Sequence, residues 1–352
     1  MNSSLRAASA LVIGLLVLTG CQSSASESPA ASEGGESAAP STDDLTGDIQ
    51  ISGSSTVKPI SDLVFEAFVT AHPLVSGFVD GPGTGDGMAL FCDDGIDIAN
   101  ASRTISEEEA AACEAAGVEY VELKVAIDGM AVITSAFNTE IECLSFLDLY
   151  ALLGPESEGF ETWDAADELA AELDTQLAGE RGDSHAPYPG EELTVIAPGE
   201  ESGTYDSFVE LAIRGIADDR EQDRVTRPDY QASPDDNVII SGVAGTEDAP
   251  FTLGWVGFAF ADENSDTVTM IPVDSGDGCV EATPETIASA EYPLSRFLYL
   301  YVNLARAESN PAVAAFIDFY LSDEGLANVT EADYIALPEA DVEATRAAWE
   351  GR

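Results

Sequence analysis

Three short segments combine glycine with hydroxyl residues, and each precedes a stretch with a helical pattern. They are Gly53-Ser54-Ser55-Thr56, Gly81-Pro82-Gly83-Thr84-Gly85-Asp86-Gly87 and Gly199-Glu200-Glu201-Ser202-Gly203-Thr204. The first turn of a helix has unpaired backbone N–H groups and a partial positive charge, so hydroxyl residues there can donate to a tetrahedral oxyanion. Each segment alone is equally typical of an ordinary helix N-cap. Three in one chain favour a sulfate-like or phosphate-like anion held by several helix beginnings.

Alternating strand and helix patterns position these segments and indicate an α/β chain. A strand at Ile49 to Ser52 precedes the first segment, and a strand at Leu193 to Ala197 precedes the third. A helix with one apolar face follows each of these two strands. Further strands are expected at 118–123, 130–134, 251–260 and 297–302, with helices at 144–153 and around 313–320. Trp163 and Trp255 are expected in the core.

The first 20 residues read as an export signal, with Arg6 before an apolar run from Ala7 to Leu18. That run of about twelve residues is too short to span a bilayer. It ends in Leu18-Thr19-Gly20-Cys21, which resembles the bacterial lipobox and implies a lipidated Cys21. The alternative is an ordinary cleaved signal. Residues 21–47 are predicted to be the lipidated cysteine and a disordered linker, because they contain too few apolar residues to offset chain entropy.

The composition is strongly acidic, with 66 Asp and Glu against 13 Lys and Arg and a formal charge of −53. This charge argues against nucleic acid or an anionic membrane surface as a partner. It favours a salty or acidic habitat, because molar salt shortens the Debye length to about 3 Å and low pH neutralises carboxylates. Acidic pairs such as Asp93-Asp94 and Asp235-Asp236 are interpreted as solvated surface, with calcium binding as the alternative.

Four cysteines remain once Cys21 is assigned to the lipid. An exported chain can form disulfides, and four cysteines allow three pairings. We expect Cys92 with Cys113 and Cys143 with Cys279. Zinc is the alternative, but no two cysteines have close ligand spacing and the only histidines are His72 and His185. The prediction is therefore no metal and no cofactor.

The glycine and hydroxyl segments and their neighbours resemble the phosphate-specific binding proteins of ABC transporters, the PstS family, over nearly all of the chain after the linker. The matching stretches are GSSTVKPI (53–60), GTGDG (83–87), DIANASRTI (97–105), PGEESGTYDSF (198–208), SPDDN (233–237), LGWVGFAFA (253–261), YPLSRFLYLYV (292–302) and YIALPEADVEATRAAW (334–349). The resemblance implies an α/β periplasmic-binding-protein fold, type II-like, with two lobes that are each a mixed sheet flanked by helices. Lobe 1 would comprise 48–128 and 292–352, lobe 2 would comprise 129–291, and the chain would cross between them near Asp128-Gly129 and near Tyr292.

The same resemblance implies a set of phosphate-binding residues. They are Ser54, Ser55, Thr56, Thr84, Asp86, Ser102, Arg103, Ser202, Gly203 and Thr204. Two positions depart from the family pattern, since Pro198 stands where many members have Arg and Arg103 where many have Asp. Another carboxylate must then accept the proton of phosphate, and Asp86 is the first candidate and Asp97 the second. Arg103, Arg227 and Arg296 are candidate counter-charges, with ordinary ion pairs to neighbouring carboxylates as the alternative.

The function implied is extracytoplasmic binding of inorganic phosphate and its delivery to a membrane permease, by a monomer attached to the outer face of the membrane through its lipid. Alternatives are a binding protein for another tetrahedral oxyanion such as arsenate or sulfate, and a phosphate sensor or scavenger. A phosphoesterase is disfavoured, because no metal-ligand spacing and no general base near Ser202 are evident. The chain is therefore predicted not to be an enzyme.

Overall fold

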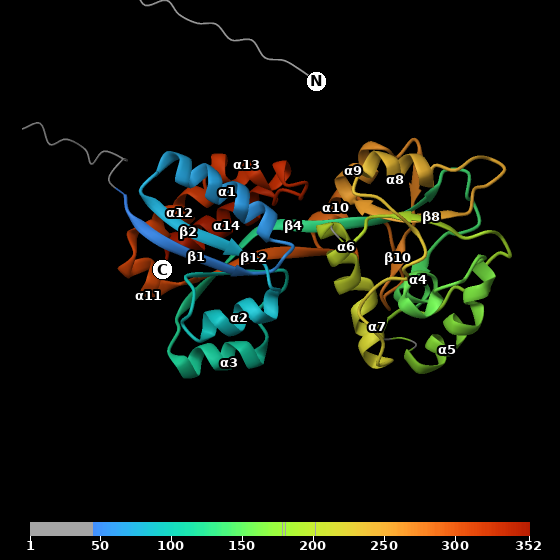
Figure 1. The fold of residues 1–352 in the computed structure, drawn as a ribbon, viewed down its shortest axis with the longest axis horizontal. Helices are drawn as coiled ribbons and strands as arrows, with labels where there is room; N and C mark the ends of the chain where they lie inside the picture. The colour runs from blue at the N-terminus through green and yellow to red at the C-terminus, as the bar shows by residue number, and fades with distance from the viewer. Residues whose placement is uncertain (1–44, 178, 180, 201) are drawn as a thin grey trace, which may run out of the picture. The chain divides into compact units, whose positions relative to one another are not determined.

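The computed structural model describes residues 45–177, 179, 181–200 and 202–352 (Figure 1). The predicted export signal, the lipidated Cys21 and the linker up to residue 44 lie outside the described residues, as does Glu201 in the third glycine segment.

The described residues form strands and helices that alternate along much of the chain. The strands are β1 Gly47–Gly53, β2 Val75–Asp80, β3 Ile98–Ala101, β4 Tyr120–Ser135, β5 Leu144–Ser145, β6 Thr194–Ala197, β7 Gln231–Ala232, β8 Thr252–Gly257, β9 Val268–Met270, β10 Val273–Asp274, β11 Cys279–Val280 and β12 Ser295–Asn303. The helices are α1 Lys58–Ala71, α2 Thr84–Cys92, α3 Glu107–Ala116, α4 Phe146–Leu153, α5 Asp167–Leu177, α6 Gly203–Phe208, α7 Arg214–Asp219, α8 Asp236–Val243, α9 Phe258–Glu263, α10 Pro284–Ala288, α11 Leu304–Ser309, α12 Pro311–Tyr320, α13 Asp323–Glu331 and α14 Glu339–Glu350. Short 3-10 turns cover Pro155–Ser157 and Trp163–Ala166, and a π-helical turn at Val209–Ile213 joins α6 to α7.

The long strand β4 pairs with different strands along its length. In the part of the chain that the structure describes, the main sheet has the order β2-β1-β3-β12-β4-β8-β6-β7, and β9 also pairs with β4. Residues Tyr120 to Gly129 of β4 pair antiparallel with β12, whereas Met130 to Ser135 pair with β8 and β9. Figure 1 shows β4 and β12 running between the two groups of helices. The two strands predicted at 118–123 and 130–134 are therefore a single strand, because the residues between them pair with β12.

Separate hydrophobic clusters lie on either side of this crossing. One cluster is built from residues between Ile127 and Leu294, with Leu337 added from near the end of the chain. A second combines residues 49–126 with residues 298–349. In it, the apolar face of α1 packs on α12, where the Phe68 and Phe316 ring centroids lie 5.4 Å apart. The apolar face predicted for α1 therefore packs against α12. This packing fixes the position of the glycine segment at residues 53–56, which precedes the helix.

Two local predictions need correction. Residues 251–260 were expected to form one strand, but β8 ends at Gly257 and α9 begins at Phe258. Apolar runs of this length do not distinguish a buried strand from a strand followed by a buried helix turn. The helix expected from residue 144 begins at Phe146, because Ser145 and Asp148 form a capping box at its start. Trp163 and Trp255 are buried, as expected.

The described cysteines form the disulfides Cys92–Cys113 and Cys143–Cys279, which are the expected pairings. The first joins the end of α2 to α3. The second joins the residue before β5 to the start of β11, and both of those strands pair with β10. Each disulfide therefore links elements that are already neighbours in the fold.

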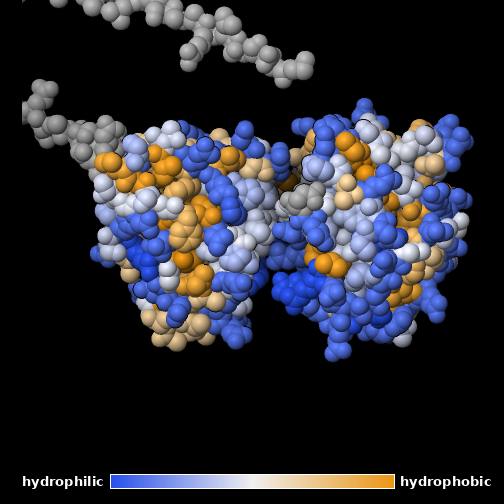
Figure 2. All heavy atoms as spheres, in the orientation of Figure 1, coloured by the Kyte–Doolittle hydropathy of each residue, from blue (hydrophilic) through white to orange (hydrophobic). Residues whose placement is uncertain are grey.

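The visible surface of the molecule is mainly hydrophilic, with scattered apolar patches (Figure 2). This agrees with the excess of acidic residues in the sequence. Among the described helices, none is long and apolar enough to cross a bilayer.

Candidate functional site

The end of β1 and the start of α1 form a tight turn at the first glycine segment. Gly53 has φ of 141°, and a Cβ atom there would lie 2.1 Å from the backbone oxygen of Asn100. The Ser54 N–H donates to that same oxygen at 2.9 Å, and Ser54 Oγ accepts from the N–H of Val57. Glycine at residue 53 is therefore required both by backbone conformation and by the approach of the neighbouring strand.

The start of α2 packs against this turn. Gly83 caps the helix with φ of 113°, and its N–H donates to the oxygen of Gly53 at 2.9 Å. A Cβ atom at Gly87 would lie only 2.3 Å from the Cα of Gly53, so the second glycine segment allows the helix to reach the end of β1. Thr84 is buried, and its Oγ1 accepts from the backbone N–H of Ser102 at 3.1 Å. The segments around Gly53, Thr84 and Ser102 thus meet through glycine and hydroxyl contacts.

A cavity of about 420 Å³ lies at this meeting point. It brings together six of the predicted binding residues, which are Ser54, Ser55, Thr84, Asp86, Ser102 and Arg103. The segment from residue 206 to residue 224 contributes lining residues that were not predicted, which are Asp206, Val209, Glu210, Arg214 and Arg224. Thr56 is buried next to the cavity rather than among its lining residues.

The third glycine segment faces elsewhere. Ser202 caps α6, and its Oγ accepts from the N–H of Thr204 at 3.2 Å. Ser202, Gly203 and Thr204 line a second cavity of about 890 Å³, together with residues such as Asp128 and Tyr334. The structure therefore brings Ser55 and Thr84 to one cavity and places Thr204 in another. The physical reason is that the turn before α1 contacts α6 one turn further along that helix, where Ser207 Oγ lies 3.4 Å from Thr56 Oγ1.

The charges of these two cavities differ. Among the described lining residues of the 420 Å³ cavity, the three acidic side chains Asp86, Asp206 and Glu210 are matched by Arg103, Arg214 and Arg224. The 890 Å³ cavity has Asp128, Asp235, Asp236, Glu263 and Asp333, and its described lining includes no Lys or Arg. Since the chain has only 13 basic residues against 66 acidic ones, three arginines at one cavity are a marked local concentration. The smaller cavity is the one suited to an anion.

Arg103 is held at the rim of that cavity by an ion pair. Its Nη1 and Nη2 donate to the two oxygens of Glu109, each at 2.8 Å. The hydrogen bonds from Arg103 lower the pKa of Glu109 to about 2, with a further contribution from Ser106, and the pair raises the pKa of Arg103. Arg103 therefore forms an ordinary ion pair with a neighbouring carboxylate, which was the alternative to ligand binding for this residue.

The ion pair predicts a pH dependence of stability. Because folding depresses the pKa of Glu109 from 4.5 to about 2, its contribution to the free energy of unfolding is present above pH 4.5 and is lost as the pH falls towards 2. Glu109→Gln keeps the capping geometry at Ser106 but removes the charge. The difference in unfolding free energy between wild type and Glu109→Gln, measured in urea, should be largest near neutral pH and shrink below pH 4.5. Glu108→Gln, at an exposed neighbouring position, is the control; a difference that does not change with pH would contradict this account.

Arg296, near the start of β12, contacts side chains from several segments of the chain. Its Nη2 donates to Thr56 Oγ1 at 3.2 Å and to Ser207 Oγ at 3.1 Å. Its Nε contacts Asp128 at 3.1 Å, and its Nη1 contacts Glu210 at 2.7 Å. The side chain is only 11% exposed, and the nearby carboxylates hold the pKa of Arg296 above its usual value despite its burial. One buried cation therefore connects the turn before α1 to α6.

The remaining sequence candidates have structural roles away from the cavity. Arg227 pairs with Asp229 and donates to the backbone oxygen of Phe160. Asp97 accepts from the backbone N–H of Gln50 at 2.7 Å and pairs with Arg306. Both side chains are therefore satisfied by these neighbours.

The sequence analysis did not predict that Asp206 in α6 and Glu210 in the following turn would line the cavity. Glu210 accepts from Ser102 Oγ at 3.4 Å in addition to its contact with Arg296, so its carboxylate joins the residue after β3 to β12. Burial raises the pKa of Asp206, and a hydrogen bond from Ser55 opposes that shift. A signal was present, because Asp206, Glu210 and Arg214 recur every four residues on the helical face opposite to Phe208 and Ala212.

Comparison with known proteins assigns the chain to a family. A model of the PBP superfamily domain matches residues 28–324. Protein SphX of Synechocystis is 36% identical over 292 residues, which cover 83% of this chain and 79% of SphX. Phosphate-binding protein PstS of Staphylococcus aureus is 30% identical over 309 residues, which cover 87% of this chain and 83% of PstS.

A solved structure agrees with these matches. The crystal structure of a possible phosphate binding protein from Planctomyces limnophilus is 35% identical, has a TM-score of 0.76, and covers 87% of this chain and 99% of its own. The predicted two-lobed α/β fold is thereby confirmed. The chain belongs to the PBP superfamily and, within it, to the family of SphX and the phosphate-binding protein PstS.

Proposed function

We propose that this protein binds inorganic phosphate outside the cytoplasm and delivers it to the permease of an ABC transporter. The observation that carries the proposal is the 420 Å³ cavity, where hydroxyls from three segments of lobe 1 meet three arginines in a chain of formal charge −53. Hydroxyl and N–H donors at helix beginnings suit a small dianion. Phosphate as the ligand is supported by the similarity to the phosphate-binding protein PstS of Staphylococcus aureus and to the possible phosphate binding protein of Planctomyces limnophilus.

Lobe 1 consists of residues 48–128 and 292–352, and lobe 2 consists of residues 129–291, in this proposal. The separate hydrophobic clusters and the crossing of β4 support these bounds. Phosphate binds first to Ser54, Ser55, Thr84 and Ser102 in lobe 1. A hinge motion of lobe 2 then carries Ser202, Gly203 and Thr204 towards the anion. Their position one turn from Ser207, which already contacts Thr56 of lobe 1, supports this step.

Asp206 serves as the acceptor for the proton of phosphate, in place of the Asp that many PstS proteins have at the position of Arg103. It lies on lobe 2 and lines the cavity, and Ser55 donates a hydrogen bond to it. Sulfate has no proton to donate, so an ionised acceptor disfavours it. Asp86 also lines the cavity and is the alternative acceptor.

Titration calorimetry of the unlipidated chain with phosphate and sulfate tests this function. We expect phosphate to bind with a dissociation constant of about 1 µM or lower, which corresponds to about −8 kcal/mol, and sulfate to bind at least tenfold more weakly. Asp206→Asn should remove most of that preference, since an amide can donate to sulfate. Asp86→Asn is the matched control in the same cavity. Equal affinity of the wild type for both anions would contradict the proposal, and loss of preference only in Asp86→Asn would move the acceptor to that residue.

The protein binds its ligand without transforming it, as its family consists of substrate-binding proteins. The described lining residues of the 420 Å³ cavity include no His or Cys that could act as a base or nucleophile. A chromogenic phosphate ester should therefore show no turnover that copurifies with the protein. Turnover abolished by Asp206→Asn would show the opposite.

The protein acts as a monomer anchored to the outer face of the membrane by acyl groups on Cys21. The lipobox-like sequence Leu18 to Cys21 supports the anchor, and the composition of residues 22–44 suits a tether. Cys21→Ser should move the protein from the membrane fraction to the soluble extracytoplasmic fraction. Retention of Cys21→Ser on the membrane would contradict lipid anchoring.

A further inference from the structure

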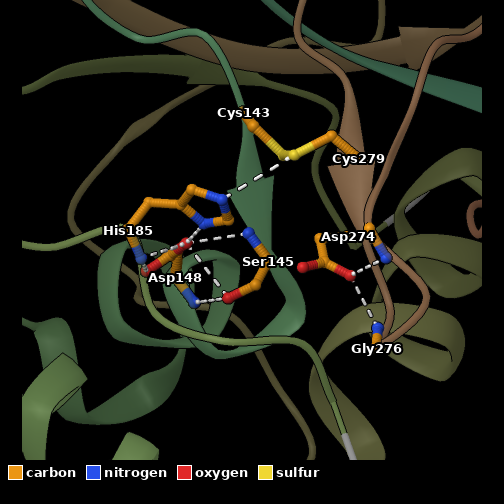
Figure 3. The surroundings of a disulfide bond; sticks show 8 residues. Cys143, Ser145, Asp148, His185, Asp274, Gly276 and Cys279 are labelled. Carbon is orange, nitrogen blue, oxygen red and sulfur yellow. Dashed lines mark hydrogen bonds and ion pairs between the residues drawn. A yellow bond between two sulfur atoms is a disulfide. The ribbon is translucent and has the colours of Figure 1, made fainter. Parts of the chain in front are cut away.

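The disulfide Cys143–Cys279 lies beside the imidazole of His185 (Figure 3). The His185 Nε2 is 3.7 Å from Cys279 Sγ, and the ligand atoms of Cys143, His185 and Cys279 all lie within 4.8 Å of one another. His185 and Cys279 are exposed, and all three residues line a cavity of about 630 Å³. Among the described lining residues, this cavity has none in common with the proposed phosphate site. Small molecules can therefore reach the cluster without entering that site.

The orientation of His185 is fixed by the buried carboxylate of Asp148. His185 Nδ1 lies 2.8 Å from Asp148 Oδ2, and the His185 backbone N–H donates to Asp148 Oδ1 at 3.0 Å. Asp148 is held in turn by Ser145 at the start of α4 and by the hydroxyl of Tyr188. With Nδ1 turned to the carboxylate, Nε2 is the ring nitrogen that faces the sulfur atoms (Figure 3). Metal-binding histidines have this arrangement, because a carboxylate on one nitrogen orients the other and increases its basicity.

The backbones of the two cysteines are held by strands as well as by the disulfide. Leu144, next to Cys143, pairs with Val273 of β10. Cys279 pairs with Asp274 on the other side of β10. The Cα atoms of the cysteines are 6.1 Å apart. The three-stranded sheet therefore keeps both side chains next to His185 when the bond between the sulfurs is broken.

Two thiolates and one imidazole form a donor set that selects zinc among the common divalent cations. Zinc prefers four ligands, and the carboxylates of Glu140 and Glu142 line the same cavity. A carboxylate or a water molecule can complete the tetrahedron. The spacing in the sequence did not predict such a site, because residues 143, 185 and 279 come together only in the fold.

We propose that reduction of Cys143–Cys279 converts this cluster into a zinc site with the ligands Cys143, His185 and Cys279 and with Asp148 as a positioning residue. Two equivalents of a small thiol reduce the disulfide, giving one small-molecule disulfide and two protein thiols. Zinc then binds both sulfurs and His185 Nε2, and the two thiol protons pass to solvent. Reoxidation by a small-molecule disulfide returns two electrons to that oxidant and releases the ion. The site is thus occupied only when the disulfide is open.

Cobalt substitution tests the proposal in the mature chain carrying Cys21→Ser, which removes the lipidated thiol. The protein is reduced with a phosphine under argon and titrated with Co²⁺ in excess Mg²⁺, which occupies surface carboxylates but competes poorly for thiolates. We expect one equivalent of Co²⁺ to give the thiolate-to-cobalt charge-transfer band and the d–d bands of tetrahedral cobalt, and Zn²⁺ to abolish both. The oxidised protein should give neither band.

Variants assign the ligands. His185→Ala should weaken Co²⁺ binding at least tenfold, and Asp148→Asn should weaken it about tenfold or more. His72→Ala, at the other histidine, and Cys92→Ser with Cys113→Ser, at the buried disulfide, should keep the full spectrum. Equal spectra in wild type and in Cys143→Ser with Cys279→Ser would overturn the proposal. So would loss of near-ultraviolet circular dichroism on reduction, because the sheet would then not hold the cysteines in place.

Discussion

Replacing Arg296 with Met should lower the free energy of unfolding by about 3 kcal/mol. The guanidinium is only 11% exposed and is the counter-charge for Asp128 and Glu210. Removing one partner of a buried ion pair leaves an uncompensated charge, which typically costs about 3–5 kcal/mol. The lower end applies because the side chain of Glu210 is 29% exposed and can be hydrated. Urea unfolding of the unlipidated chain measures this difference.

Two further variants test whether the loss of stability in Arg296→Met comes from the unpaired buried charge or from a general disturbance of packing. Arg214→Met removes a guanidinium that also lies near Glu210, but at 4.0 Å and with 47% exposure, so its effect should stay below about 1 kcal/mol. Arg296→Met combined with Asp128→Asn should recover part of the lost stability, because the unpaired buried charge is then absent. An unchanged unfolding midpoint in Arg296→Met, or no recovery in the double variant, would show that Arg296 does not have this role.

Gly87→Ala and Gly85→Ala should have opposite effects, although both lie in the first turns of α2. A Cβ at Gly87 would meet the Cα of Gly53 at 2.3 Å, whereas a Cβ at Gly85 would have nothing within 4 Å. Forcing α2 away from the end of β1 should cost about 1–3 kcal/mol of stability. Gly85→Ala should gain about 0.5–1 kcal/mol, because alanine restricts the unfolded chain and favours the helix.

Gly87→Ala should also affect the proposed phosphate site. Moving α2 also moves Gly83 and Thr84, which contact Gly53 and Ser102. Gly87→Ala should therefore weaken phosphate binding at least tenfold at a temperature where the variant remains folded, as calorimetry would measure. Unchanged phosphate affinity in a clearly destabilised Gly87→Ala would mean that the start of α2 does not position ligand groups.

Two of the three glycine segments of the candidate site could be predicted from local sequence. The glycine and hydroxyl segments at residues 53–56 and 81–87 follow strands or precede apolar helix patterns, and the structure brings both to one cavity. These predictions succeed because helix beginnings and tight turns depend on residues close in the chain. The long strand β4 was divided in two because its middle is polar at Asp128 and permissive at Gly129, and only pairing with the distant β12 joins the halves.

The partners of charged side chains could not be predicted. Arg103 contacts Glu109 six residues away, but Arg296 reaches Asp128 and Glu210 across 168 and 86 positions in the sequence. In a chain with 66 carboxylates, sequence alone gives each arginine many potential partners. The same limit applies to Thr204, whose helix start has the predicted composition but faces a different cavity from Thr84. Which side of a helix contacts the other lobe is a tertiary property.

A crystal structure of the protein grown with phosphate would show directly which cavity holds the anion. We expect one phosphate in the cavity between Ser55, Thr84 and Ser102, with Asp206 within hydrogen-bonding distance and the start of α6 moved towards the anion. A phosphate bound among the carboxylates of the 890 Å³ cavity, or a phosphate that leaves Thr84 and Ser102 hydrogen-bonded only to each other, would contradict it.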